Sequence, residues 1–163
     1  MRGSGPDALV LLYDTALPDV YGYLVSRCGS VSLAEDLTSE VFMAAVAAVQ
    51  SGRKPAPTVA WLISVARNKL IDHWRHREVE QRRLAVVDGP TLSDDWEVVL
   101  DVMRSNEVLA ALGAHHRSAL TLRYLDGLAV REVADHLGRT VHATEALLVR
   151  ARHAFRRLYG EDA

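Results

Sequence analysis

Apolar residues recur every three or four positions along most of the chain, which is the spacing of an amphipathic α-helix rather than of a β-strand. The first apolar stripe runs from Leu9 to Val25 and stops before Gly29, a residue type that commonly ends helices. Asp7 is placed to cap this helix, and Pro18 inside it predicts a kink or a restart. The pattern therefore predicts a helical N-terminal segment.

The next two stripes predict two longer helices. An S-x-x-E sequence at residues 32–35 is typical of a capping box, and the apolar positions behind it continue to Val49. Thr58 is placed to cap a third helix, whose apolar positions run from Trp61 to Trp74. Because both tryptophans lie in this helical register, we expect them in the core rather than on a stacking surface.

A break in the pattern divides the chain into two parts. Residues 85–95 contain a Gly-Pro pair and several acidic residues, which predicts a linker. Helical spacing then resumes in four segments, at residues 96–112, 114–125, 130–137 and 141–158. We therefore expect an all-α fold of two small helical domains joined by a flexible acidic linker, with boundaries at residues 7–84, 85–104 and 105–159.

The composition is that of a soluble globular protein. The chain has 163 residues, of which 49% are hydrophobic and 25% charged, so it is long enough to bury a core. The single cysteine, Cys28, excludes an intrachain disulfide and a cysteine-based zinc site. The N-terminus lacks the apolar run of a signal peptide, and we find no window near the ~20 apolar residues of a membrane span. We expect a cytoplasmic protein without stable membrane insertion.

The charge is divided unevenly along the chain. A formal net charge of -2 argues against a generic nucleic-acid binder. However, residues 61–87 hold six basic and three acidic residues, and residues 117–163 hold eight and six. Residues 88–116, between them, hold one basic and six acidic residues. Two basic blocks separated by an acidic one are compatible with two separate nucleic-acid contacts.

Residues 128–152 predict a helix-turn-helix. A short apolar helix ending at Leu137 is followed by a tight turn at residues 138–140 and by a longer helix with Leu148 and Phe155 on one face. Such a pair can place its second helix in the major groove of DNA. The same pattern also fits an ordinary corner between two helices of a bundle, and the geometry alone does not separate these two interpretations.

Residues 61–77 predict a basic helix with an exposed amide. The segment combines arginine, lysine and histidine with Asn68, whose side chain can hydrogen-bond a base edge. That mixture suits single-stranded DNA, where the bases are accessible and the phosphates dominate affinity. Taken by itself, the segment equally fits a solvated basic helix face.

Several motifs in fixed order resemble one family. The segments ALPDVYGYL, AEDLTSEVFMAA and WLISVARNKLIDHWR are similar to region 2 of bacterial RNA polymerase sigma factors of the extracytoplasmic-function (ECF) group. The segments LTLRYLDGLAVREVADHLG and TVHATEALLVRAR resemble region 4 of the same group. The resemblance spans residues 7–158. It implies a sigma factor without catalytic residues, metal or cofactor, which directs core RNA polymerase to promoters and helps to open the DNA.

The resemblance also implies which residues make the contacts. In the family, the segment that matches residues 36–40 docks on the core polymerase, which implicates Asp36, Leu37, Thr38 and Glu40. In the family, the residue that matches Asn68 contacts the bases of the melted minus-ten element, and neighbouring basic residues hold the DNA backbone. The second helix of the helix-turn-helix reads the minus-thirty-five duplex. The implied DNA-binding residues are Arg67, Asn68, Lys69, His73, Arg75, Arg77, Thr140, His142, Ala143, Ala146, Arg150 and Arg152.

The recognition helix departs from the family pattern. Glu145, Ala146 and Leu147 stand where the family usually has Lys-Ser-Arg. A carboxylate repels phosphates, although it can accept from a cytosine amino group. We therefore expect the second domain to bind DNA weakly by itself. Our hypothesis is that Leu147 and Val149 contact a protein such as an anti-sigma factor or an activator.

Two other classes of function are compatible with parts of the sequence. An enzyme with a metal site in a helical bundle is conceivable, because His73 and His76 lie one turn apart and the acidic residues Glu35, Asp36 and Glu40 share a helix. No glycine-rich phosphate loop or nucleophile elbow supports this alternative. A helix-turn-helix regulator with an N-terminal sensing or dimerisation bundle explains residues 128–152 equally well. It leaves residues 61–77 without a role.

Overall fold

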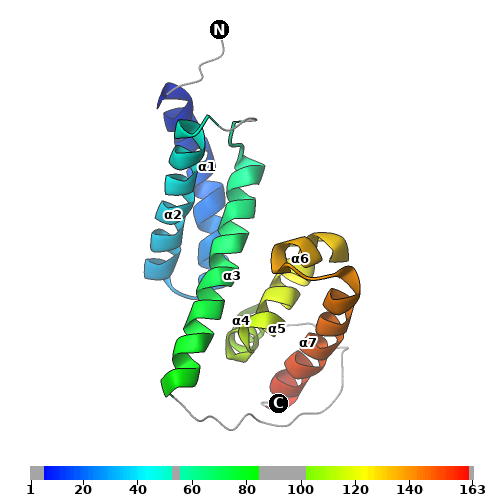
Figure 1. The fold of residues 1–163 in the computed structure, drawn as a ribbon. Helices are drawn as coiled ribbons and strands as arrows, with labels where there is room; N and C mark the ends of the chain where they lie inside the picture. The colour runs from blue at the N-terminus through cyan, green and yellow to red at the C-terminus, as the bar shows by residue number, and fades with distance from the viewer. Residues whose placement is uncertain (1–5, 53–55, 85–101, 162–163) are drawn as a thin grey trace. The chain divides into compact units, whose positions relative to one another are not determined.

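The computed structural model describes residues 6–52, 56–84 and 102–161, and all of its regular elements are helical (Figure 1). This confirms the predicted all-α fold for the described part of the chain. The contacts between residues divide the chain into a first unit, residues 1–72, and a second unit, residues 73–163. In chain order the elements are α1 (Pro6–Cys28), α2 (Val31–Gln50), α3 (Val59–Leu84), α4 (Val102–Ala111), α5 (Ala114–Leu120), the π-helical segment η1 (Thr121–Leu125), α6 (Val130–Leu137) and α7 (Val141–Glu161).

The division between the units falls inside α3, which is one continuous helix. Most of the predicted linker, residues 85–101, lies outside the described residues. Its last three positions belong to α4, because that helix already begins at Val102. The domain boundaries drawn from the sequence stay a prediction.

Helix α1 starts at a different residue from the one predicted but ends where it was predicted to end. The helix begins at Pro6, so Asp7 lies in the first turn rather than at the cap. Proline suits this place because the first turn has no internal partner for its N–H. Helix α1 runs through Pro18 to Cys28, and Gly29 ends it with φ +68°, a conformation that costs glycine little.

The predicted capping box of α2 is wrong by two residues. Ser30, not Ser32, is the N-cap, and its Oγ accepts a hydrogen bond from the Leu33 N–H at 3.3 Å. Ser32 lies within the first turn of the helix, so the S-x-x-E sequence is not used as a cap. The cap of α3 is the one predicted, since Thr58 Oγ1 accepts from the Trp61 N–H at 3.2 Å.

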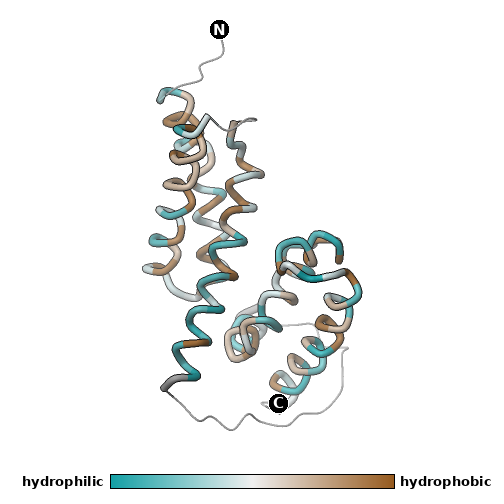
Figure 2. Tube along the Cα trace, in the orientation of Figure 1, coloured by the Kyte–Doolittle hydropathy of each residue, from teal (hydrophilic) through white to brown (hydrophobic). Residues whose placement is uncertain are grey.

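The first unit has a core of small and branched aliphatic side chains. Val20 and Leu24 of α1, Val41 of α2 and Leu62 of α3 are all fully buried. The Tyr13 ring of α1 and the Phe42 ring of α2 meet edge to face, with centroids 4.7 Å apart. Figure 2 shows the apolar positions of these helices recurring along each coil, as the sequence pattern predicts.

One expectation about α1 needs correction. By length and composition alone, α1 is apolar enough to cross a membrane, whereas the sequence analysis found no segment near that limit. The same properties fit a helix that packs in a bundle. Ala16, Val20 and Leu24 of α1 are fully buried, and α1 packs along α2.

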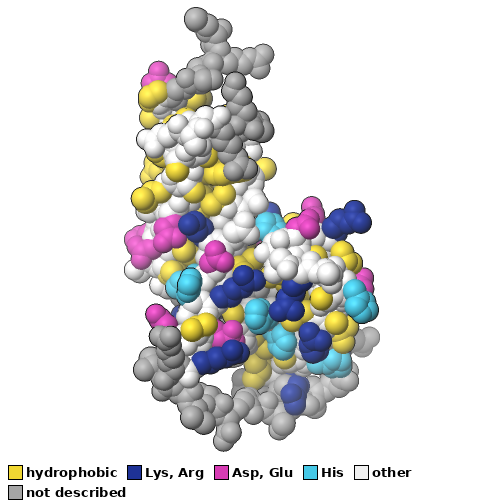
Figure 3. All heavy atoms as spheres, in the orientation of Figure 1, with side chains coloured by type: hydrophobic (Ala, Val, Ile, Leu, Met, Phe, Trp, Pro, Cys, Tyr) yellow, Lys and Arg dark blue, Asp and Glu magenta, His cyan; other side chains and the backbone are white. Residues whose placement is uncertain are grey.

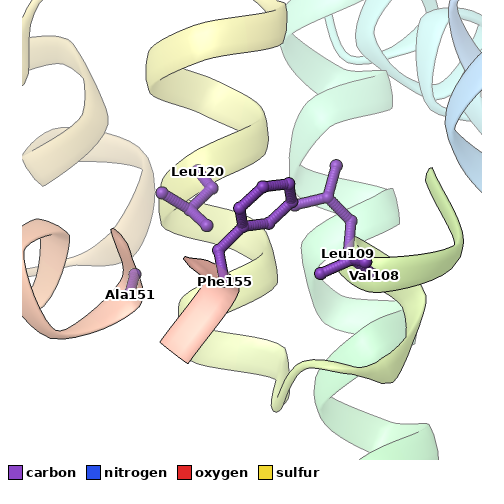
Figure 4. Close-up of a cluster of buried hydrophobic side chains, with 5 residues drawn as sticks. All are labelled: Val108, Leu109, Leu120, Ala151 and Phe155. Atoms are coloured by element: carbon purple, nitrogen blue, oxygen red, sulfur yellow. The ribbon is translucent and has the colours of Figure 1, made fainter. Parts of the chain in front are cut away.

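The second unit is organised around a cluster that joins α4, α5 and α7. Phe155 of α7 is 4% exposed and packs among Val108, Leu109, Leu120 and Ala151 (Figure 4). Burying a phenylalanine contributes about 2 to 3 kcal/mol of apolar transfer free energy. This cluster fixes the position of α7 on the helices that precede it in the chain.

The helix-turn-helix has well-defined ends. The Glu132 carboxylate accepts from the Ala129 N–H at 2.9 Å at the start of α6. Gly138 ends α6 with φ +64°, and Thr140 begins α7, since its Oγ1 accepts from the Ala143 N–H at 3.1 Å. The turn predicted at residues 138–140 is confirmed, as are the bounds of α6.

Candidate nucleic-acid and protein interfaces

The predicted polymerase-binding residues on α2 divide into two exposed and two buried positions. Asp36 and Glu40 are one turn apart and exposed. Leu37 and Thr38 are 4% and 6% exposed, and Thr38 Oγ1 donates to the Ala34 carbonyl at 2.6 Å. The two buried residues hold the helix in the bundle. Of these four residues, Asp36 and Glu40 are therefore the two available to a partner.

Glu40 also connects two predicted interfaces. Its carboxylate lies 3.9 Å from Lys69 Nζ on α3, and both side chains are substantially exposed. An exposed ion pair of this kind contributes about 0 to 1 kcal/mol. The structure thus brings together one residue predicted to bind polymerase and one predicted to bind DNA.

Within the first unit, the predicted DNA-binding residues of α3 point in different directions. Consecutive helical residues are separated by about 100°, so Arg67, Asn68 and Lys69 cannot share one face. The Arg67 guanidinium lies 5.7 Å from the centre of the Tyr23 ring of α1. Asn68 is exposed, and so is Asp72 one turn further on. The Asn68 amide is therefore exposed on α3, and the Asp72 carboxylate lies one turn away on the same face.

The remaining residues predicted on α3 belong to the second unit. His73 is half-buried, Arg77 is exposed, and Arg75 Nη2 donates to the Leu137 carbonyl at a long 3.5 Å. Glu78 was not among the residues predicted from the sequence, and its Oε1 accepts from the Ala114 N–H at 3.3 Å. An acceptor is needed there because the N–H groups of the first turn have no partner within α5.

Trp74 is in the core, as predicted from its helical register. It is 5% exposed, and the Arg117 guanidinium of α5 lies 4.1 Å from the centre of its ring. This cation–π contact lies within the second unit. It gives Trp74 a structural role, while Trp61 is half-buried.

The recognition helix α7 presents two stripes of different chemistry. Ala143, Ala146 and Arg150 recur at spacings of three and four residues, so they form one stripe, and Arg139 lies in the turn before the helix. Arg139 and the two alanines are half-exposed, whereas Arg150 is exposed. A second stripe is more exposed and consists of His142, Glu145, Val149 and the half-exposed Arg152. Thr140 stands at the start of both and caps the helix.

The structure changes the hypothesis about a protein contact on α7. Leu147 is 3% exposed, so it belongs to the core and is not available to a partner. It faces inward because it lies one turn from Thr144 and Ala151, which are both fully buried. Val149 is 45% exposed and remains as the surface part of that hypothesis.

Arg152 is held by a residue that the sequence analysis did not single out. Its Nη1 donates to the Tyr124 hydroxyl at 3.0 Å. Tyr124 lies in η1, where the Asp126 N–H reaches back to the Thr121 carbonyl at 3.0 Å. Such π-helical insertions are often found at functional sites. Apolar spacing could not reveal this one, because the predicted helix simply continued to Leu125.

Two adjacent histidines at the start of α5 have perturbed acidity. Burial lowers the pKa of both His115 and His116. The Arg139 guanidinium lowers the pKa of His115 further, and the Arg150 guanidinium does the same for His116. The Glu78 carboxylate opposes these effects at both sites.

The described residues do not assemble a metal site. No three side chains among His, Cys, Asp and Glu in that part of the chain lie close enough to hold an ion. Cys28 is buried at the end of α1, where it serves as a small core residue. Neither the histidine pair of α3 nor the acidic residues of α2 belong to such a group among the described residues.

Comparison with known proteins places this chain in a family. The model of Sigma-70 region 2 matches residues 12–79, and that of Sigma-70 region 4 matches residues 106–154. The ECF RNA polymerase sigma factor SigM of Bacillus subtilis is 30% identical over 91% of this chain and 93% of its own length. The chain therefore belongs to the ECF sigma factors, which confirms the resemblance seen in its motifs.

Two further relatives define the extent of the likeness. The ECF RNA polymerase sigma factor BldN of Streptomyces coelicolor is 35% identical over 96% of this chain, and the match covers 62% of BldN. The sigma factor RpoE of Bartonella quintana, solved with the anti-sigma factor NepR, matches with a TM-score of 0.60 and 23% identity. That match covers 96% of this chain and 99% of RpoE. It shows the same fold.

Proposed function

We propose that this chain is a dissociable specificity subunit that binds core RNA polymerase, directs it to promoters and helps to open the DNA. The observation that carries the proposal is the presence of both sigma-type units on one chain, matched in order over residues 12–79 and 106–154. Neither unit requires a catalytic group for this work. Binding energy that favours the melted DNA is sufficient to shift the equilibrium toward opening.

The first unit provides the polymerase contact and the minus-ten contact in this proposal. Asp36 and Glu40 offer an acidic helix face on which a helix of the polymerase can pack. Asn68 is exposed on α3 and can hydrogen-bond a base that has left the stack. Lys69, the next residue of α3, is partly exposed and can neutralise a phosphate.

The second unit provides the minus-thirty-five contact. Helix α7 presents His142, Arg150 and the small side chains of Ala143 and Ala146. Small residues let the helix approach the groove closely, while Glu145, which is exposed, repels phosphates. We therefore infer weak duplex binding by the free chain, and promoter recognition only in complex with the polymerase.

A protein regulator completes the proposal. Val149 is an exposed apolar residue on α7, beside the DNA-reading stripe. An anti-sigma factor or an activator that covered it would compete with DNA or add to its binding. The cytoplasm is the compartment in which such a polymerase subunit acts.

Run-off transcription tests the function directly. Core polymerase with this chain is expected to start at defined sites on genomic DNA fragments, whereas core polymerase alone does not. Duplex binding without initiation would refute the proposal and favour the helix-turn-helix regulator. That alternative is not favoured here, because it gives no role to the match of residues 12–79 with region 2.

A further inference from the structure

Helix α2 exposes an apolar residue on the same face as its acidic pair. Met43 is 70% exposed, which exceeds the exposure of Leu11 at 65% and of Val10 at 61%. Asp36, Glu40 and Met43 follow one another at spacings of four and three residues, so they lie on one face of the helix. Figure 3 shows acidic side chains over α2 and exposed hydrophobic side chains further along the same helix. The face proposed to bind the polymerase therefore includes a methionine.

The packing of α2 does not depend on the Met43 side chain. Val41 and Ala45, two residues before and two residues after it, are fully buried and hold the helix in the bundle. Leu37, on the same buried side, is 4% exposed. A change in the polarity of Met43 therefore leaves the core of the first unit intact. Its effect is confined to a partner that covers this face.

We propose that Met43 is an oxidation site, and that conversion of its thioether to the sulfoxide by a hydroperoxide weakens the docking of α2 on core polymerase. This inference rests on the proposed function, because it assigns a means of control to the polymerase-binding face. Met43 stands within the motif AEDLTSEVFMAA but was not among the residues predicted from it. Its exposure and its place beside Asp36 and Glu40 are what single it out.

The reaction needs only an accessible sulfur and the oxidant, for which hydrogen peroxide is the simplest choice. A lone pair of Met43 Sδ attacks one peroxide oxygen, so that the O–O bond breaks and an S–O bond forms. The sulfur loses two electrons, and the peroxide accepts them. The departing hydroxide takes the proton of the transferred hydroxyl and leaves as water. The products are one sulfoxide and one water molecule.

Burial shields the thiol of the chain from the same oxidant. Cys28 is 8% exposed and lies in the core at the end of α1. Buried structural cysteines are inert, because reaction requires an accessible thiolate. Met43 is open to a small oxidant, and its thioether needs no deprotonation to react. Peroxide is therefore expected to reach Met43 before it reaches Cys28.

Oxidation replaces the apolar end of the side chain by a strongly polar group. A docking helix that covers the reduced Met43 gains apolar transfer free energy. The sulfoxide oxygen is a hydrogen-bond acceptor, and burying it without a donor costs free energy. The neighbouring groups on this face, Asp36 and Glu40, are carboxylates and offer it no donor. The oxidised face is therefore a poorer surface for the polymerase.

The modification is reversible, which suits a means of control. Methionine sulfoxide reductases return the sulfoxide to the thioether. Two electrons come from a pair of thiols, which form a disulfide, and the sulfoxide oxygen leaves as water. Docking on the polymerase is thus expected to weaken in the presence of peroxide and to recover when thiol-dependent reduction prevails.

The test measures the affinity of the full, fluorescently labelled chain for core polymerase by anisotropy, before and after treatment with hydrogen peroxide and its removal. Peptide mass spectrometry reports the oxidation of Met1, Met43 and Met103 separately. The wild-type chain with the sulfoxide at Met43 is expected to bind about tenfold more weakly. Sulfoxide reductase with a dithiol should restore the affinity. The urea midpoint of the oxidised chain should stay unchanged, because Met43 is not part of the core.

Three variants assign the effect to one sulfur atom. Met43→Leu should keep its affinity after treatment, because leucine is apolar, similar in volume and cannot be oxidised in this way. Met43→Gln places a polar group of similar length on the face and should bind about tenfold more weakly without any treatment. The matched control is Met103→Leu, which retains Met43 and should lose affinity on treatment as the wild-type chain does.

Undiminished affinity of a chain that carries the sulfoxide at Met43 would overturn the proposal. An equal loss of affinity in the wild-type chain and in Met43→Leu would do the same, because the oxidation that matters would then lie elsewhere. Absence of oxidation at Met43 after treatment would also overturn it. Failure of the untreated chain to bind core polymerase would refute the proposed function instead, so the two failures are distinguishable.

Discussion

Helices α3 and α7 begin in the same way and then differ. Each is capped by a threonine, Thr58 or Thr140, whose Oγ1 accepts from the N–H three residues later, at 3.2 Å and 3.1 Å. Beyond the cap, α3 exposes an amide, Asn68, whereas α7 exposes alanines between arginines. The comparison shows that the same helix start can precede two helices with different exposed side chains.

The two helices also differ in how their cations are held. Arg67 of α3 lies near the Tyr23 ring of the first unit, and Lys69 lies near Glu40. On α7, Arg152 is held by the neutral hydroxyl of Tyr124, and Arg150 has no carboxylate partner among the described residues. Lys69 of α3 thus has a carboxylate neighbour, which Arg150 of α7 lacks among the described residues.

The largest effect should come from the core that supports α7. Phe155→Ala removes the centre of the cluster around Leu120 and should lower the free energy of unfolding of the second unit by about 3 to 5 kcal/mol. Urea unfolding followed by circular dichroism measures it. The matched change Met43→Ala, at a residue that is 70% exposed, should alter stability by less than about 0.5 kcal/mol. Equal effects of the two changes would contradict this description of the core.

A smaller but specific effect is expected at α3. Asn68→Ala should reduce open-complex formation by about tenfold, since one hydrogen bond to an unstacked base contributes roughly 1 to 3 kcal/mol. Permanganate reactivity of the minus-ten thymines reports the opening. Binding to core polymerase should stay unchanged, because Asn68 is not on the acidic face of α2. Loss of polymerase binding would show that this residue is misplaced in our proposal.

The corresponding change on α7 should strengthen binding. Glu145→Lys replaces an exposed carboxylate by a cation on the helix that we propose to face DNA, and it should raise duplex affinity about three- to tenfold at low salt. The logarithm of the affinity should also fall more steeply with the logarithm of the salt concentration. Glu145→Gln is the control, and it should give a smaller gain in the same direction. If neither variant binds more tightly, α7 does not face the DNA in this way.

The shared caps allow a matched pair of changes. Thr58→Ala and Thr140→Ala each remove one side-chain acceptor from a helix start, and each should cost about 1 kcal/mol of stability. Urea unfolding of the two variants measures this cost. Thr140→Ala should in addition weaken duplex binding, because it disorders the first turn of α7. A loss of duplex binding in Thr58→Ala alone would reverse the assignment of the two helices.

The smallest effect expected is the dependence of stability on pH. In the folded chain the pKa of His115 and of His116 lies below the ordinary value of 6.5, so the unfolded chain binds more protons. Stability should therefore be full above about pH 6.5 and decline as the pH falls below it. Both side chains are partly solvated, so the decline is modest. In the double variant His115→Gln/His116→Gln, the urea midpoint should change less between pH 7 and pH 5.5 than in the wild-type chain. The same pH dependence in both chains would contradict these directions.

Local sequence rules predicted the elements and failed at particular caps. Apolar spacing and Gly138 placed α6 correctly, and Thr58 was recognised as the cap of α3. The S-x-x-E sequence was misleading, because Ser30 is also a good cap and lies two residues earlier. Two serines compete there for the same role. Which of them wins depends on how α1 and α2 join, and helix propensity does not contain that information.

The candidate sites were less predictable than the helices. Leu37, Thr38 and Leu147 stand within motifs that pointed to contacts, yet all three are buried. Tyr124 and Glu78 were missed because their roles depend on partners 28 and 36 residues away in the chain. Motifs identify a segment. They do not say which of its side chains face solvent, since that depends on the helices packed against it.

The sequence by itself determined the helical class, the division into two basic segments and the membership in the ECF sigma factors. These features depend on local spacing and on the order of motifs, which a linear chain carries in full. Tertiary structure alone decided that Asp36 and Glu40 are exposed on α2 while Leu37 and Thr38 are buried, and that Arg152 meets Tyr124. It also placed His115 and His116 beside arginines of the helix-turn-helix. The physical reason is that burial and charge proximity arise between segments distant along the chain, and they exist only once those segments are packed.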